Sequence, residues 1–163
     1  MNDVILPRIL SSTGTFIGRA NGRDYHLIPQ IAESTACDGF ELMLLEDWSE
    51  RLPAVCDFLL ASGFLPETVH LEKNIGVLLS AGTKKCAKEA LEIYRRDMEA
   101  AARLGARLAV LHFWGGRLSD YHIDKNLSLI PLFYDIAAES GILLTIENIP
   151  CVYGTPLFMW NRI

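Results

Sequence analysis

Short apolar runs alternate with longer amphipathic segments along this 163-residue chain, and this alternation restricts the possible fold most. The short runs are rich in Val, Ile, Leu and aromatic residues and have Gly or Pro near most of their ends, as β-strands do. They cover residues 4–12, 39–45, 67–73, 107–114 and 142–148. Helical patterns cover residues 25–36, 50–62, 84–104, 125–140 and 155–161. Strands and helices in alternation, without hairpin signals, predict right-handed βαβ units and a parallel sheet.

Two α/β architectures fit this order of elements: an open doubly wound sheet and a (β/α) barrel. The first loop, STGTFIGRANGRD, contains neither GxGxxG nor GxxxxGK[ST], so nucleotide binding is disfavoured. A complete TIM-type barrel takes roughly 250 residues, or about 31 per unit, so 163 residues make about five units. A barrel built by this chain would therefore be partial: a single α/β domain over residues 1–163 with about five parallel βα units, lacking the last three.

Composition excludes several classes of protein. The chain has 15 basic and 20 acidic residues, a formal net charge of −5, and half of it is hydrophobic. The apolar content argues against disorder, and the acidic balance argues against a nucleic-acid partner. No apolar run reaches the ~20 residues of a membrane helix, and Asp3, Pro7 and Arg8 are unlike a signal peptide. The four cysteines form no CxxC pair, which favours free thiols and a reducing, cytoplasmic setting.

Three side chains able to bind a metal lie near the ends of three consecutive predicted strands: His70, His112 and Glu147. Alternate residues of a strand share a face, and neighbouring strands lie ~4.8 Å apart. The three can therefore converge at the carboxyl edge of the sheet, where parallel α/β folds place active sites. A buried carboxylate needs a cation or a donor, and His with Glu suits Zn²⁺ or Mn²⁺. Taken singly, each also fits a structural role, as a His satisfied by one hydrogen bond or a Glu that caps a turn.

Five further residues are weaker candidates. Glu41 is expected to face inward and to orient an imidazole, or else to pair with a nearby cation. Lys73 is placed to reach a substrate oxygen, or else is a solvated charge. Trp114 is a candidate to line a sugar face, and core packing fits it equally well. Ser119 or Asp120 is expected to cap the helix that follows.

The segments STGTFIGR, DGFELML, VHLEKNIG, LGARLAVLHFWGG, SD and IENIPC, in this order and spacing, resemble the sugar phosphate isomerase/epimerase family. This is the xylose isomerase-like TIM barrel superfamily, which also contains apurinic endonucleases of the endonuclease IV type. The resemblance implies a (β/α)₈ barrel with one or more divalent metal ions (Mn²⁺, Zn²⁺ or Mg²⁺) at the carboxyl ends of its strands. It implies that Glu147 is a metal ligand and, from the endonuclease branch, that His70 and His112 bind zinc.

The resemblance also implies that part of the barrel is missing. The chain ends at Ile163, where a sixth strand is expected, and the family's other ligands, an Asp, a His and a Glu, lie on strands six to eight. We therefore expect a truncated or incomplete form, for which metal binding and activity are open questions. Open edges at the first and last strands, and an exposed interior face, predict self-association.

Three functions follow from these observations. The first is a metal-dependent isomerase or epimerase acting on a sugar or sugar phosphate, with Glu147 as a ligand and His70 and His112 as ligands or substrate contacts. The second is an apurinic endonuclease-like phosphodiesterase, favoured by the two histidines and disfavoured by the net charge of −5. The third is a non-catalytic half-barrel that serves as an assembly or binding module.

Overall fold

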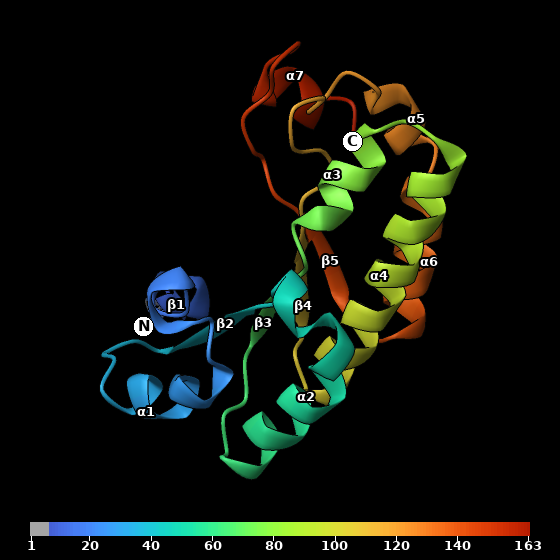
Figure 1. Ribbon diagram of the computed structural model, residues 1–163. Coiled ribbons are helices and arrows are strands. Elements are labelled where there is room, and N and C mark those ends of the chain that lie inside the picture. The colour runs from blue at the N-terminus through green and yellow to red at the C-terminus, as the bar shows by residue number, and fades with distance from the viewer. Residues whose placement is uncertain (1–6) are drawn as a thin grey trace, which may run out of the picture.

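The computed structural model describes residues 7–163 and contains one parallel sheet of five strands in the order β1-β2-β3-β4-β5 (Figure 1). The strands are β1 (Leu10–Ser12), β2 (Gly39–Met43), β3 (Thr68–His70), β4 (Leu108–Leu111) and β5 (Leu143–Ile146). Each strand pairs with the next one along the chain, so the sheet grows in one direction without a reversal of order. This is the strand order of a barrel and differs from that of a doubly wound sheet, which reverses at a switch point.

Seven α-helices connect or follow these strands in the described part of the chain. They are α1 (Ile28–Glu33), α2 (Leu52–Ala61), α3 (Asn74–Ser80), α4 (Lys84–Arg103), α5 (Ile123–Leu127), α6 (Ile130–Glu139) and α7 (Pro156–Trp160). Short 3₁₀ segments cover Thr13–Thr15, Arg19–Asn21, Tyr25–Leu27 and Glu46–Arg51. In Figure 1, α2, α4 and α6 lie along the same side of the sheet. None of the helices described is long and apolar enough to cross a membrane.

The two faces of the sheet have different surroundings. One face carries the apolar residues of the core: Leu42, Val69, Ala109, Leu111 and Leu144 are all at most 6% exposed. On the other face, which would be the interior of a closed barrel, Leu143 is 66% exposed. Thr68 and His70 on this same face are buried, so the expected exposure of the interior face is present only in part. The five parallel strands in sequential order form a partial (β/α) barrel.

The longest helix, α4, shows how the local sequence defines an element. The Thr83 hydroxyl oxygen accepts a hydrogen bond from the backbone N–H of Cys86, which caps the first turn. Gly105 follows the helix at φ +75°, a conformation that glycine adopts without steric cost. Tyr94, Met98 and Ala101 recur at helical spacing and are fully buried, so this face packs on the core.

The predicted elements agree with the structure in order and type, with several differences in extent. All five strands are present but shorter than predicted, and residues 4–6 of the first prediction lie outside the described residues. The predicted helix over 125–140 is two helices, α5 and α6, since Pro131 has no backbone N–H to donate to the carbonyl oxygen of Leu127, as a continuous helix would require. Helix α3 was not predicted, because seven residues with a glycine in the first turn give little helical pattern.

Gly76 lets α3 pack directly on the chain that leaves β4. A Cβ atom at this position would lie 2.5 Å from the carbonyl oxygen of Trp114 and 2.7 Å from that of His112. Because backbone atoms must move to relieve such contacts, we expect Gly76→Ala to lower the free energy of unfolding by about 1–3 kcal/mol. Urea denaturation checks this. Gly18→Ala is the matched control, since nothing lies within 4 Å of its added Cβ. Equal midpoints for the two variants would contradict the prediction.

Candidate metal centre

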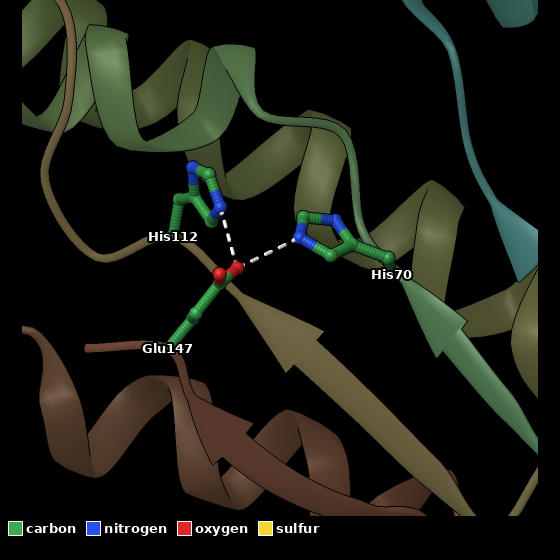
Figure 2. A group of neighbouring side chains, drawn as sticks. All are labelled: His70, His112 and Glu147. Carbon is green, nitrogen blue, oxygen red and sulfur yellow. Dashed lines mark hydrogen bonds and ion pairs between the residues drawn. The ribbon is translucent and has the colours of Figure 1, made fainter. Parts of the chain in front are cut away.

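The carboxyl ends of β3, β4 and β5 bring three polar side chains together (Figure 2). His70 is the last residue of β3, while His112 and Glu147 each follow their strand by one residue. In the sheet register His70 lies beside Val110 of β4, which lies beside Thr145 of β5. His112 and Glu147 are therefore two residues further along the same face, and all three side chains point into the barrel side of the sheet.

Both imidazoles point at one carboxylate oxygen. Nε2 of His70 lies 3.0 Å, and Nε2 of His112 2.7 Å, from Oε2 of Glu147. One ligand atom from each residue can be chosen so that all three lie within 4.8 Å of one another. The two rings stand edge to face, with centroids 4.9 Å apart. Among residues 7–163, His70, His112 and Glu147 are the His, Cys, Asp or Glu side chains that lie close enough together to hold a metal ion as a group of three.

His70 is held in one orientation by the backbone. Its Nδ1 lies 2.8 Å from the carbonyl oxygen of Leu71, and its side chain is 5% exposed. Because a carbonyl oxygen only accepts hydrogen bonds, Nδ1 is the nitrogen that carries the proton. In the neutral ring, Nε2 then presents a lone pair toward the carboxylate of Glu147. Two acceptors 3.0 Å apart repel unless a proton or a metal ion lies between them.

The surroundings favour the metal-binding forms of His112 and Glu147. Desolvation by burial and the neighbouring His70 lower the pKa of His112, and they outweigh the hydrogen bond to Glu147, which acts to raise it. Burial acts to raise the pKa of Glu147, but hydrogen bonds from His70 and His112 outweigh it and hold that pKa below its ordinary value. His112 is therefore neutral, and Glu147 ionised, over a wider range of pH than in water.

These causes predict two shifts of opposite sign in the pKa of His112. Glu147→Gln removes a group that raises this pKa, so it should fall further below its ordinary value. His70→Gln removes a neighbouring imidazole whose electrostatic effect lowers the pKa of His112, so that pKa should rise. An NMR titration of the His112 ring protons in the metal-free chain measures both shifts. A midpoint raised by Glu147→Gln would show that the carboxylate does not stabilise the imidazolium.

The other predicted site residues occupy three different settings. Glu41 is half-buried on the same face, but it lies beside Thr68, two residues below the level of His70. Within residues 7–163 it forms no hydrogen bond to either imidazole, and the ring of His70 is oriented by Leu71 instead. Lys73 is exposed, and its charge contributes to the low pKa of His112, so it lies within electrostatic reach of the cluster.

Trp114 requires a correction. Its side chain is 1% exposed, and its Nε1–H donates to the carbonyl oxygen of Pro150 at 3.3 Å. Its ring is therefore part of the core and does not line a sugar face in this structure. The strand ends at Leu111, so the alternation that would place Trp114 on the face of His112 no longer applies.

Asp120 has a structural role that the sequence did not reveal. It was expected to cap a helix, but its carboxylate accepts hydrogen bonds from the backbone N–H groups of Val152, Tyr153 and Gly154 at 2.6–3.0 Å. These residues belong to the loop that follows β5 and Glu147. A pairing over more than 30 residues has no local signal, so only the structure could identify it.

No protein-family model and no curated protein sequence matches the chain. Solved structures do match it. A D-tagatose 3-epimerase-like protein aligns with 91% of this chain at 21% identity and a TM-score of 0.65. The D-allulose 3-epimerase from Methylomonas sp., in complex with D-allulose, aligns with 96% at 14% identity and a TM-score of 0.65. A sugar phosphate isomerase/epimerase from Parabacteroides distasonis aligns with 89% at 12% identity and a TM-score of 0.53.

The chain shares its fold with these three solved proteins. It covers 55%, 59% and 52% of the lengths of these three proteins, so it corresponds to about half of such a barrel. The family resemblance found in the sequence is thereby confirmed at the level of the fold. At identities of 12–21%, the similarity shows the architecture alone.

Proposed function

We propose that this chain binds a divalent metal ion through His70, His112 and Glu147 and serves isomerase or epimerase chemistry on a sugar or sugar phosphate. The observation that supports this most is the convergence of two imidazole nitrogens on one carboxylate oxygen, at 2.7 and 3.0 Å. For His70, whose Nδ1 is bonded to Leu71, this arrangement requires a second ring proton or a metal ion between Nε2 and the carboxylate.

The donor set fits Zn²⁺ or Mn²⁺ better than Mg²⁺. Two imidazoles and one carboxylate are common ligands of zinc and manganese, whereas magnesium prefers oxygen donors throughout. Three protein ligands also leave a coordination position for a substrate oxygen, as in catalytic zinc sites. Glu147, with 45% of its side chain exposed, gives such a substrate access to the cluster from solvent.

The chemistry of the site follows from these ligands and their neighbours. A bound metal ion would polarise a sugar carbonyl and make the adjacent C–H bond more acidic. The ammonium group of Lys73, exposed at the same edge, would bind a substrate oxygen. The carboxylate of Glu41 lies on the same face of the sheet. We propose that it orients a neighbouring side chain or the substrate, or that it transfers a proton.

Deuterium exchange tests the proposed function. The chain is incubated in D₂O with Mn²⁺ and D-allulose or D-tagatose, and NMR follows the hydrogen on the carbon beside the carbonyl. We expect exchange that depends on the metal ion and is lost in Glu147→Gln. Metal binding without exchange for any ketose or ketose phosphate would contradict the isomerase or epimerase function and leave a binding module.

A second function has one observation in its favour. Histidines at the ends of β3 and β4 match, by the resemblance, zinc ligands of apurinic endonucleases. Incubation with abasic duplex DNA and Zn²⁺ distinguishes the two functions. Nicking that is lost in His70→Gln and His112→Gln would replace the sugar proposal, while the net charge of −5 leads us to expect none.

A further inference from the structure

Asp97 is a buried carboxylate that the proposed chemistry does not use. It lies on α4 and is 0% exposed. Its Oδ1 accepts hydrogen bonds from Nε and a terminal nitrogen of Arg96, at 3.1 and 2.8 Å. Its Oδ2 accepts one from the backbone N–H of Glu72, at 2.9 Å. Burial raises the pKa of Asp97 to about 6 despite these hydrogen bonds, so placing a charge here is costly.

The backbone N–H that Asp97 binds has a specific partner on its other side. The N–H of Glu72 and the carbonyl oxygen of Leu71 belong to one planar peptide unit. That carbonyl oxygen accepts the Nδ1 proton of His70 at 2.8 Å. A continuous series of hydrogen bonds therefore runs from Asp97, through the peptide unit, to the imidazole whose Nε2 faces Glu147.

We propose that Asp97 is a positioning residue for His70, acting through the peptide unit that joins Leu71 to Glu72. The carboxylate fixes the plane of this unit and polarises it, which strengthens the carbonyl oxygen as an acceptor. The carbonyl in turn keeps the proton of His70 on Nδ1 and the Nε2 lone pair directed into the site. Histidines that bind metals commonly donate their other N–H to a carboxylate or carbonyl group. Here the carboxylate acts through one intervening peptide.

Arg96 and Glu72 complete the arrangement. A terminal nitrogen of Arg96 lies 2.7 Å from Oε2 of Glu72, and the Ser49 hydroxyl lies 3.2 Å from the same oxygen. The side chain and the backbone of Glu72 are therefore both tied to α4, so the segment directly after β3 is held at two points. A residue of purely structural importance would tie the helix to the strand but would leave the tautomer of His70 unchanged.

The experiment measures the His70 ring itself in the metal-free chain. In ¹⁵N-histidine-labelled protein, we expect His70 to show a proton on Nδ1 with a downfield shift and slow exchange with water. Asp97→Asn should move this signal upfield, speed its exchange and populate the Nε2–H tautomer. The matched control is Tyr94→Phe, which removes a buried hydrogen bond of the same helix to the Phe133 carbonyl, on the side of α6. A His70 signal that is the same in Asp97→Asn and Tyr94→Phe overturns the proposal.

A second measurement, made on the wild-type chain, tests the proposal if the Asp97→Asn variant does not fold. In the wild-type chain, couplings across hydrogen bonds should link Nδ1 of His70 to the carbonyl carbon of Leu71, and the amide nitrogen of Glu72 to the carboxyl carbon of Asp97. Absence of either coupling overturns the proposal.

The consequence for metal binding rests on the proposed function and is measured separately. If the folded Asp97→Asn chain is obtained, its zinc affinity should fall by about 10–100-fold, the usual effect of losing such a supporting group. If the His70 signal moves but the wild-type chain binds no zinc, the positioning role stands and the proposed function fails. If zinc binds and the signal does not move, the proposed function stands and the role of Asp97 fails.

Discussion

Replacement of Glu147 by Gln lowers the affinity of the chain for Zn²⁺ by more than about 100-fold, because it removes a metal ligand, and loss of a supporting group alone costs 10–100-fold. The change is nearly isosteric, so the packing around β5 is retained. The carboxylate that both imidazoles face becomes a neutral amide, and its single oxygen is a much weaker ligand. Isothermal titration of Zn²⁺, with a competing chelator, measures the change in affinity.

A control variant separates this effect from a general loss of charge. Glu139→Gln makes the same substitution at the exposed carboxyl end of α6, and we expect it to leave zinc affinity unchanged. Equal affinities for the wild type and Glu147→Gln would mean that zinc binds elsewhere on the chain. Equal losses in Glu147→Gln and Glu139→Gln would mean that binding depends on net charge and not on the site.

Replacement of Asp120 by Ala lowers the free energy of unfolding by about 3 kcal/mol or more, since three backbone N–H groups lose a charged acceptor. These groups belong to Val152, Tyr153 and Gly154, and Asp120 is itself 2% exposed. Burial acts to raise the pKa of Asp120, but these hydrogen bonds outweigh it, and the pKa lies below its ordinary value. The stabilisation is therefore complete above the pKa of the unfolded chain and is lost as the pH falls through the lower folded value.

Urea denaturation at neutral pH measures this effect at full size. Asp135→Ala is the control, because Asp135 is an exposed carboxylate on α6, and we expect it to change stability by less than about 0.5 kcal/mol. The difference between the two variants should shrink as the pH approaches the folded pKa of Asp120. A difference below about 1 kcal/mol at neutral pH would show that the loop does not depend on this carboxylate.

Much of the fold could be predicted from the sequence because the strands are short, apolar and separated by helices. The period-two alternation placed His70, His112 and Glu147 on one face, and the parallel order placed them at one edge. Both inferences need only local pattern and topology. The convergence of the three side chains followed from the sequence for this reason, while their part in metal binding remains a proposal.

The exact placement of several candidate residues depends on geometry that the sequence does not contain. Glu41 was placed on the correct face, but only the register with β3 shows that it lies below the level of His70. Trp114 lies three residues beyond the end of β4, where the strand alternation no longer applies, and its ring is buried in the core. Asp97 had a usable signal that was missed: a carboxylate three residues after Tyr94 and four before Ala101 lies on the apolar face of α4.

The most direct test of the metal centre is anomalous diffraction at the zinc edge from crystals of the chain grown with Zn²⁺. We predict one peak per chain, about 2.0–2.2 Å from Nε2 of His70, Nε2 of His112 and a carboxylate oxygen of Glu147. A zinc ion bound at full occupancy to other residues, with His70 and His112 still directed at Glu147, would contradict the account.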